Sequence, residues 1–183
     1  MTKRKTLLIG LAAVAIGLFA GIYAGQRHAA SPPVVAPPLA AGSIERLFAS
    51  TLDDTNGRAQ AFTQWQGKTL VVNFWATWCP PCREEMPAFS QLQTKYAAND
   101  VQFVGIALDT PENVRDFAKQ FPVAYPLLIG GGTATDLARQ LGDAQLVLPY
   151  TLVIGPGGEL RFRQPGRVSE PELERSLPQT AAR

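Results

Sequence analysis

Residues 70–82 read Leu-Val-Val-Asn-Phe-Trp-Ala-Thr-Trp-Cys-Pro-Pro-Cys, and the rest of the chain is organised around this stretch. Its first half is an apolar, β-branched run of the kind that forms a buried strand. It ends in Cys79 and Cys82, the only two cysteines of the protein. A helix can begin near Pro81, because the first turn of a helix tolerates proline, and Pro87 should bend, break or end it. A Cys-x-x-Cys pair between a strand and a helix is typical of a redox-active dithiol.

The spacing of the two cysteines has a chemical reason. Cys79 is expected at the helix N-terminus, where the helix dipole and free amides favour a thiolate. Cys82 lies one turn further on the same face, close enough to form a disulfide with it. Disulfide exchange requires an exposed thiolate that attacks and a second thiol that resolves the mixed disulfide. We therefore expect the Cys79 sulfur to be water-accessible. Because Pro80 and Pro81 remove two amide donors from this turn, we expect a reducing rather than a strongly oxidising pair.

Other uses of two cysteines fit the sequence less well. A purely structural disulfide across two residues constrains little of the unfolded chain, and such stabilisation grows with loop length. A structural zinc site needs four ligands, and the chain has no third cysteine and a single histidine, His28, far upstream. We therefore expect no metal and no cofactor at this site.

The segment Val72–Pro87, Val-Asn-Phe-Trp-Ala-Thr-Trp-Cys-Pro-Pro-Cys-Arg-Glu-Glu-Met-Pro, is similar to the active-site segment of thioredoxin-like proteins. It resembles most specifically the TlpA/ResA-type membrane-anchored thiol-disulfide oxidoreductases, and the similarity extends from about Ser43 to the C-terminus. The resemblance implies an α/β thioredoxin fold with an N-terminal β-hairpin and an inserted strand and helix. In this interpretation Cys79 is the nucleophile and Cys82 the resolving thiol of a redox-active disulfide.

The resemblance also implies substrate-binding residues around the dithiol. By order and context, Pro149 matches the cis proline that faces the Cys-x-x-Cys turn in thioredoxin-like proteins. The cis bend leaves the backbone of Leu148 free to pair with an extended substrate segment. Trp78, beside the nucleophile, is expected to form an exposed apolar platform for a protein substrate, whereas Trp75 is expected in the core.

The proton acceptor for the resolving thiol is not evident from the sequence. Asn73 stands where cytosolic thioredoxins place a buried acid, and an amide cannot accept a proton at any working pH. Glu84 and Glu85 are close in sequence, and both are expected to be solvated or ion-paired helix residues; the alternative is a catalytic role for one of them.

The N-terminal segments predict export. Residues 1–5 are basic, and residues 6–25 contain no charge and are long enough to span a bilayer. The basic flank predicts a cytoplasmic N-terminus, hence a single-pass signal-anchor in the bacterial inner membrane with the catalytic domain in the periplasm. The alternative is a cleaved signal peptide. Residues 26–42 contain four prolines among small residues and indicate a semi-rigid linker to the domain at 43–183.

The charge of the protein does not favour a nucleic-acid partner. The formal net charge is +2, and because Lys3, Arg4 and Lys5 supply three positive charges, the remainder is close to neutral. A nucleic-acid-binding domain should carry a basic stripe on its folded part, and none is evident in the sequence.

Within the domain the pattern predicts alternating strands and helices. Residues 46–52 and 58–62 are expected to form a hairpin around Asn56-Gly57, and residues 130–132 a flexible glycine break. Ser169 and Glu172 match a capping box. The predicted strands are 69–75, 101–108, 125–129, 148–154 and 159–163. The predicted helices begin near residues 79, 109, 133 and 169, and they end near residues 121, 141 and 177 for the last three.

The function implied is reduction of disulfides in a partner protein. A reductant in an oxidising compartment must be recharged, and the resemblance implies a membrane electron donor of the DsbD/CcdA kind, with apocytochrome c as the expected substrate. A periplasmic oxidase or isomerase with the same fold is the first alternative. A thioredoxin-fold peroxidase is the second, although its Thr/Ser-x-x-Cys loop differs from the Trp78-Cys79 pair found here.

Overall fold

The computed structural model describes residues 38–178, and these form one folded unit. The unit begins at Pro38, and Leu39 packs against the core. The fold therefore reaches back into the segment predicted as a linker. The predicted basic segment, the signal-anchor at 6–25 and most of the linker lie outside the described residues. Within 38–178, no helix combines the length and apolar character that a membrane crossing requires.

A seven-stranded mixed sheet forms the centre of the described unit, in the order β2-β1-β5-β4-β3-β6-β7. The strands are β1 (Thr51–Asp54), β2 (Ala59–Ala61), β3 (Thr69–Trp75), β4 (Val101–Ala107), β5 (Leu127–Ile129), β6 (Tyr150–Ile154) and β7 (Leu160–Pro165). Strands β3, β4 and β5 are parallel, and all other neighbours pair antiparallel. Strand β3 is buried along its whole length, as its continuous apolar run predicts for a central strand.

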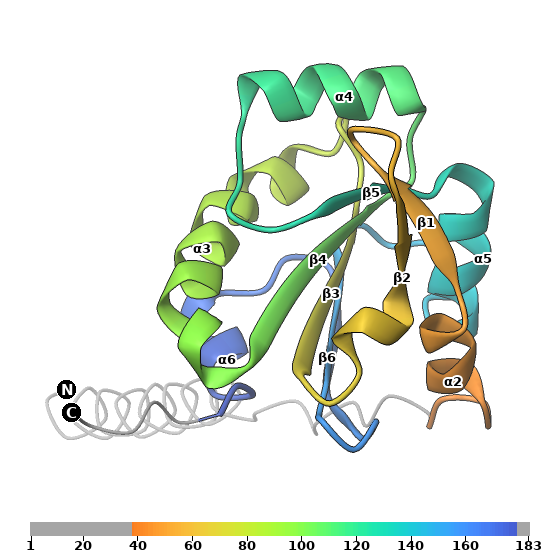
Figure 1. The fold of residues 1–183 in the computed structure, drawn as a ribbon, viewed down its shortest axis with the longest axis vertical. Helices are drawn as coiled ribbons and strands as arrows, with labels where there is room; N and C mark the ends of the chain where they lie inside the picture. The colour runs from red at the N-terminus through yellow and green to blue at the C-terminus, as the bar shows by residue number, and fades with distance from the viewer. Residues whose placement is uncertain (1–37, 179–183) are drawn as a thin grey trace, which may run out of the picture. The chain divides into compact units, whose positions relative to one another are not determined.

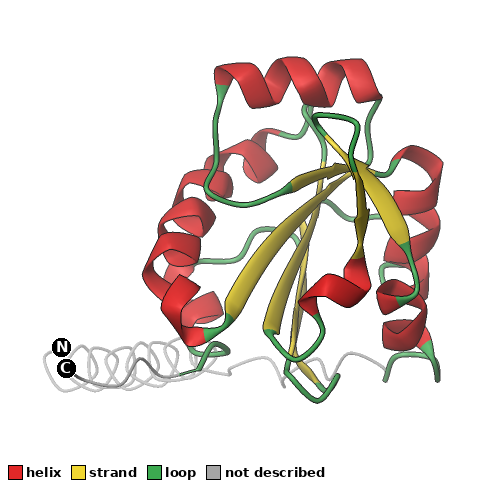
Figure 2. Ribbon diagram, viewed as in Figure 1, coloured by secondary structure: helices red, strands yellow, loops and turns green. Residues whose placement is uncertain are grey.

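Helices cover both faces of this sheet (Figures 1 and 2). They are α2 (Ser43–Phe48), α3 (Pro80–Tyr96), α4 (Pro111–Gln120), α5 (Gly131–Gln140) and α6 (Glu170–Glu174), with 3-10 turns η1 (Phe62–Trp65) and η2 (Ala97–Asn99). One hydrophobic cluster joins α3, α4 and α6 to the sheet. A second cluster, on the opposite face, joins α2, η1 and α5 to it.

The order of elements is that of a thioredoxin-like α/β fold. Strand β3, helix α3 and strand β4 are followed, after an intervening segment, by the antiparallel pair β6–β7 and the final helix α6. The hairpin β1–β2 precedes this core, and its register centres on the Asn56-Gly57 turn. Between β4 and β6 the chain forms α4, β5 and α5, so this segment holds the additional strand and helix that the resemblance implies.

The prediction for the N-terminal hairpin is wrong in its first half. Residues 43–48 form helix α2, and β1 begins only at Thr51. The reason is the spacing of Ile44, Leu47 and Phe48, which lie at i, i+3 and i+4 and pack together against the second cluster. Strand β2 is also shorter than predicted, because Phe62 turns inward as the first residue of η1.

Three predicted helix boundaries also differ. The glycines at 130–132 are not a break, since α5 begins at Gly131, and a Cβ on Gly130 would lie 2.4 Å from the Cβ of Ala134. Helix α3 continues through Pro87, whose side chain is exposed. Helix α6 ends at Glu174, and Ser169 makes no side-chain capping hydrogen bond there.

Candidate functional site

Strand β3 delivers the dithiol to one end of the sheet. After Trp75 the chain turns through Ala76–Trp78, and Cys79 is the N-cap residue of α3, with prolines in the first turn. The loop is tethered by Asp109, whose Oδ2 accepts hydrogen bonds from Thr77 N at 3.0 Å and Thr77 Oγ1 at 2.5 Å. The turn that carries the cysteines is therefore fixed to the end of β4.

Asp109 keeps its charge in this role. Its partial burial acts to raise the pKa, but the hydrogen bonds from Thr77, Asn113 and Thr110 outweigh that effect and hold the pKa of Asp109 below its ordinary value. The sequence marked Asp109 only as the start of a helix, and its role in holding the active-site loop was missed.

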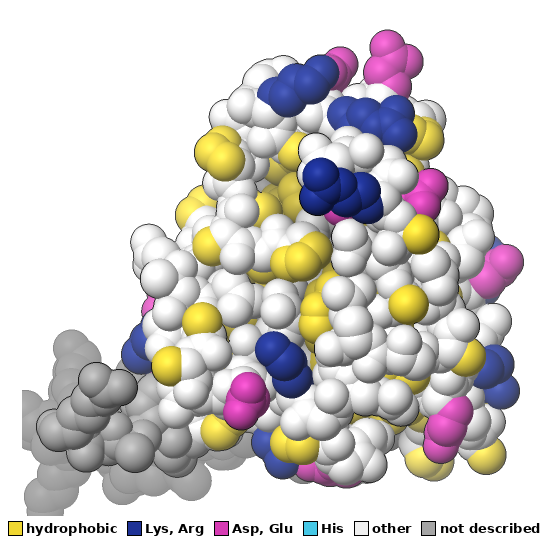
Figure 3. All heavy atoms as spheres, viewed as in Figure 1, with side chains coloured by type: hydrophobic (Ala, Val, Ile, Leu, Met, Phe, Trp, Pro, Cys, Tyr) yellow, Lys and Arg dark blue, Asp and Glu magenta, His cyan; other side chains and the backbone are white. Residues whose placement is uncertain are grey.

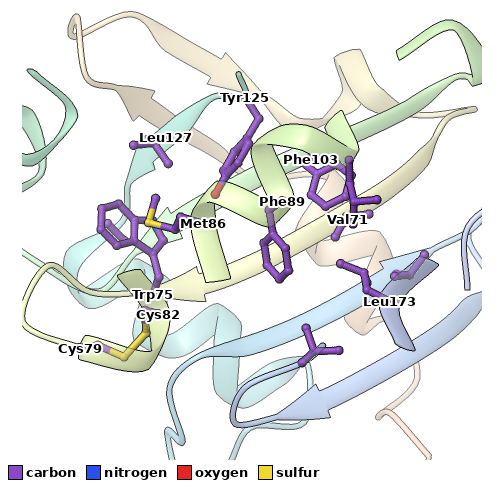
Figure 4. Packing of buried hydrophobic residues seen from close by; sticks show 14 of the residues in the cluster. Val71, Trp75, Cys79, Cys82, Met86, Phe89, Phe103, Tyr125, Leu127 and Leu173 are labelled. Carbon is purple, nitrogen blue, oxygen red and sulfur yellow. A yellow bond between two sulfur atoms is a disulfide. The ribbon is translucent and has the colours of Figure 1, made fainter. Parts of the chain in front are cut away.

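Cys79 and Cys82 are joined in a disulfide, with an S–S distance of 2.07 Å and 5.4 Å between their Cα atoms. The two cysteines belong to the first hydrophobic cluster, which also contains Trp75 and Met86 (Figure 4). The cysteines are thus in place for reversible oxidation of a vicinal dithiol.

The exposure of this disulfide is smaller than the sequence led us to expect. Cys79 was expected to be water-accessible, yet it exposes only 4% of its surface, and Cys82 exposes none. Packing of both cysteines against the apolar cluster accounts for the difference. Because so little of Cys79 is exposed, a partner must fit closely around this residue for its sulfur to react with the pair.

The two tryptophans of the motif lie as predicted. Trp75 is fully buried and packs against Phe117 in a tilted arrangement, with 4.9 Å between ring centroids. Trp78 exposes 67% of its surface, more than any other large hydrophobic side chain among the described residues. An exposed indole beside a nearly buried disulfide offers an apolar contact surface to a partner.

Leu148 and Pro149 lie at the same end of the sheet as the dithiol. Their peptide bond is cis, as the resemblance implies. Tyr150, the next residue, pairs with Phe74, so Pro149 lies opposite the end of β3, where the loop to Cys79 begins. Leu148 is partly buried and packs against the cluster that contains both cysteines.

A buried polar network lies beneath the dithiol. Asn73 Nδ2 donates to Glu85 Oε1 at 2.9 Å and to Thr151 Oγ1 at 3.0 Å, and the backbone N–H of Val168 donates to Glu85 Oε2 at 3.3 Å. Glu85 lies one helical turn beyond Cys82 on the same buried face of α3. The network therefore joins the active-site helix to β3, β6 and the segment before α6.

Glu85 corrects the prediction that both glutamates are surface residues. It exposes only 3% of its surface, and burial raises its pKa to about 7, partly opposed by the hydrogen bonds from Val168 and Asn73 and by the charge of Arg167. Glu84 is exposed, as predicted, and pairs with Arg167 at 2.5 Å. The position of Glu85 in the buried stripe of α3, three residues after Cys82, was the signal that could have revealed it.

No metal site accompanies these residues: nowhere in 38–178 do three His, Cys, Asp or Glu side chains gather as ligands.

The family model described as Redoxin matches residues 38–177, nearly the whole of the described unit. The chain belongs to the Redoxin family. Its arrangement of dithiol, cis proline and sheet is that of a TlpA/ResA-type, thioredoxin-like redoxin.

Several proteins similar to this chain are named for thiol-disulfide chemistry. The thiol-disulfide oxidoreductase ResA of Geobacillus thermodenitrificans is 28% identical over 172 residues, which cover 93% of this chain and 90% of the relative. ResA of Bacillus thuringiensis subsp. konkukian is 32% identical over 127 residues, or 68% and 70% of the two chains. A solved thiol:disulfide interchange protein of Chlorobium tepidum superposes with a TM-score of 0.62 at 29% identity, covering 69% and 89%.

These likenesses and the Cys79–Cys82 pair define the class of reaction. This redoxin is an enzyme that exchanges thiols and disulfides.

Proposed function

We propose that this protein is an exported, membrane-tethered reductase of disulfides in partner proteins. The observation that carries the proposal is the Cys79–Cys82 disulfide at the N-terminus of α3, beside the exposed indole of Trp78. A pair separated by two residues can open and close without rearranging the fold, because the helix holds both sulfurs on one turn.

In the proposed reaction the reduced enzyme transfers two electrons to its substrate. The Cys79 thiolate attacks one sulfur of the substrate disulfide, the substrate S–S bond breaks, and one substrate thiolate leaves. Cys82, deprotonated, then attacks the Cys79 sulfur of the mixed disulfide and releases the second substrate thiolate. The enzyme is left with the Cys79–Cys82 disulfide seen in the structure, and the substrate is left as a dithiol.

Glu85 supplies the proton acceptor that this second attack requires. Its carboxylate lies one turn beyond Cys82 and is held from both sides by Asn73 and Val168. With a pKa raised to about 7, it can both accept and return a proton near neutral pH. Asn73 cannot carry the proton itself, but it orients the group that does.

Trp78, Leu148 and Pro149 form the proposed contact surface for the substrate around the attacking sulfur of Cys79. Trp78 offers an exposed apolar face. The backbone of Leu148 lies two residues before β6, where an extended segment can pair with it. Such contacts would bring a substrate disulfide to Cys79.

The direction of the reaction and the partners extend the same proposal. The similar proteins named ResA are thiol-disulfide oxidoreductases, and the two prolines between the cysteines favour a reducing pair. A reductant in the periplasm requires a membrane electron donor of the DsbD/CcdA type, and apocytochrome c is the proposed substrate. Residues 6–25 would tether the enzyme to the inner membrane beside that donor.

The Cys82→Ser variant tests the proposal, because it keeps the attacking thiol and removes the resolving one. Expressed as the full chain, it should accumulate a covalent complex with its substrate that dithiothreitol releases. The Cys79→Ser variant, which keeps only the less exposed sulfur, is the matched control and should trap nothing. Equal trapping by both variants, or by neither, contradicts the assigned roles.

A further inference from the structure

A groove with a volume of about 1070 Å³ runs between the active-site helix α3 and the C-terminal end of α4. It starts beside the dithiol, where Pro80 and Arg83 line it, and each of these follows a cysteine by one residue. It continues along α3 as far as Lys95. Figure 3 shows hydrophobic side chains gathered on the surface below α4 and beside α3.

The opposite wall of the groove is aromatic and comes from the segment between β4 and β5. Phe117 and Phe121 pack against each other in a tilted arrangement, with 4.9 Å between their ring centroids, and Phe121 exposes 47% of its surface. Pro122 and Val123 extend this wall beyond the end of α4. A single exposed ring is not unusual on a protein surface, but a contiguous apolar groove next to a reactive centre is typical of an interaction site.

The charges at the rim are unevenly compensated. Glu84 is paired with Arg167, and Lys95 is paired with Glu174. The Arg83 guanidinium lies over the rings of Phe117 and Phe121, 5.9 and 5.3 Å from their centroids. Throughout residues 38–178 it has neither an ion pair nor a hydrogen bond, so the uncompensated charge of the rim is positive and lies at the end nearest the disulfide.

We propose that this groove binds the segment of the partner protein that flanks its reactive cysteine, with a carboxylate at Arg83 and aromatic or aliphatic side chains against Phe121. The proposal rests on the proposed function, since the reacting disulfide brings this segment to the mouth of the groove. The stretch of α3 from Pro80 to Lys95 is about 22 Å long at roughly 1.5 Å per residue. That length holds about six or seven residues of extended chain.

The groove differs from the contact surface formed by Trp78, Leu148 and Pro149, because none of those three residues lines it. A partner would therefore be held on two sides of its cysteine. The segment between β4 and β5 would determine which partners are accepted, while the dithiol turn would carry out the exchange.

Single-turnover exchange of the reduced full-length enzyme with three disulfides tests the proposal. The probes are the symmetric disulfide of the peptide Phe-Ala-Glu-Cys-Glu-Ala-Phe, that of Ser-Ala-Lys-Cys-Lys-Ala-Ser, and bis(2-hydroxyethyl) disulfide, each followed by chromatography of acid-quenched samples. We expect the acidic aromatic peptide to react about tenfold faster than the lysine peptide, which corresponds to roughly 1.4 kcal/mol of transition-state binding. Arg83→Ala and Phe121→Ser should each abolish this preference and leave the rate with bis(2-hydroxyethyl) disulfide unchanged.

Two further variants make the test specific. Arg115→Ala removes the same charge from an exposed position on α4 outside the groove, and it should keep the preference. Gln91→Trp fills the groove from the exposed side of α3 without disturbing the aromatic wall, and it should abolish the preference even if Phe121→Ser is unstable.

The possible failures are distinguishable. Equal rates for the two peptides, or equal slowing of all three disulfides by Arg83→Ala, would overturn the proposal for the groove and leave the proposed function in place. A wild-type dimer that Phe121→Ser dissociates in sedimentation would assign the groove to a second copy of the chain and also overturn the proposal. Absence of exchange with every disulfide would overturn the proposed function and the groove together.

Discussion

At the scale of single residues, the Glu85 carboxyl group links the stability of the fold to pH. Burial raises its pKa from 4.5 to about 7, so between these values the folded protein holds a proton that the unfolded chain has lost. The free energy of unfolding should therefore fall by about 3 kcal/mol as the pH rises through this window. In Glu85→Gln this contribution should vanish. Denaturant unfolding of the oxidised protein at pH 4.5, 6 and 8 measures it, and the free energy of unfolding of the variant should depend less on pH than that of the wild type.

The control for this prediction is the neighbouring residue. Glu84 lies on the exposed side of the same helical turn, so Glu84→Gln should leave the slope between pH 4.5 and 7 as it is in the wild type. A wild-type profile parallel to that of Glu85→Gln would show that folding does not raise the pKa of Glu85, and one that rises relative to it would show that folding lowers that pKa. Either result would contradict the account of Glu85.

Substitution of Trp78 should affect substrate recognition, whereas substitution of Trp75 should affect the stability of the fold. Because Trp78 is largely exposed and Trp75 fully buried, Trp78→Ala should change the free energy of unfolding by less than about 0.5 kcal/mol, whereas Trp75→Ala should cost about 3–5 kcal/mol. Trp78→Ala should instead slow exchange with a protein disulfide and leave bis(2-hydroxyethyl) disulfide unaffected. Urea titration and single-turnover rates measure the two effects, and a large loss of stability in Trp78→Ala would place its ring in the core.

The two redox-active cysteines could be found from the sequence, but the residues that support them could not. The spacing of Cys79 and Cys82 after an apolar strand carries its own chemical meaning. The environment of Glu85 depends on Val168, 83 positions away, and no local pattern contains such a contact. A glutamate in a helix is ordinarily solvated, so only its place in the buried stripe of α3 opposed that expectation.

At the scale of elements, helix capping gives a direct comparison between two helix starts. Thr110 Oγ1 accepts a hydrogen bond from Asn113 N at the start of α4, whereas Ser169 makes no such bond at the start of α6. Thr110→Ala should therefore lower the free energy of unfolding by about 1 kcal/mol, and Ser169→Ala should change it by less than about 0.5 kcal/mol. Thermal or denaturant unfolding of both variants checks this, and equal losses would contradict the assigned capping.

Long elements were predictable and short ones were not. Strand β3 occupies the predicted residues Thr69–Trp75, because seven consecutive buried positions leave a pattern that few alternatives share. Helix α2 has six residues, too few for its helical spacing to stand out from the apolar run that was interpreted as a strand. Strand β5 has only three, and its limits depend on its neighbours in the sheet.

At the scale of the whole molecule, the sheet order shows what a sequence leaves undetermined. The alternation of strands and helices predicts a parallel centre, and β3 and β4 provide it. Strands β1 and β5 pair and bring Asp53 beside Ile129. These segments are far apart in the sequence, and no pattern in either one indicates that they pair. The groove beside α3 depends on the packing of α4, and for the same reason it was not foreseen.

The proposed tether predicts the behaviour of the full chain in cells. With residues 6–25 as a signal-anchor, the protein should stay with the membrane pellet after alkaline carbonate extraction. Protease added to spheroplasts should digest the folded domain, because it would lie on the periplasmic side. Release by carbonate would instead favour a cleaved signal peptide, and protection of the domain from protease would contradict export.

The central claim is that the Cys79–Cys82 pair acts as a reductant, and its reduction potential tests that claim most directly. Equilibration of the full-length protein with defined ratios of reduced and oxidised dithiothreitol or glutathione, followed by alkylation and mass measurement, gives the value. The account predicts a potential near that of thioredoxin, about −270 mV. A potential near about −120 mV, as in a strong disulfide oxidant, would contradict it.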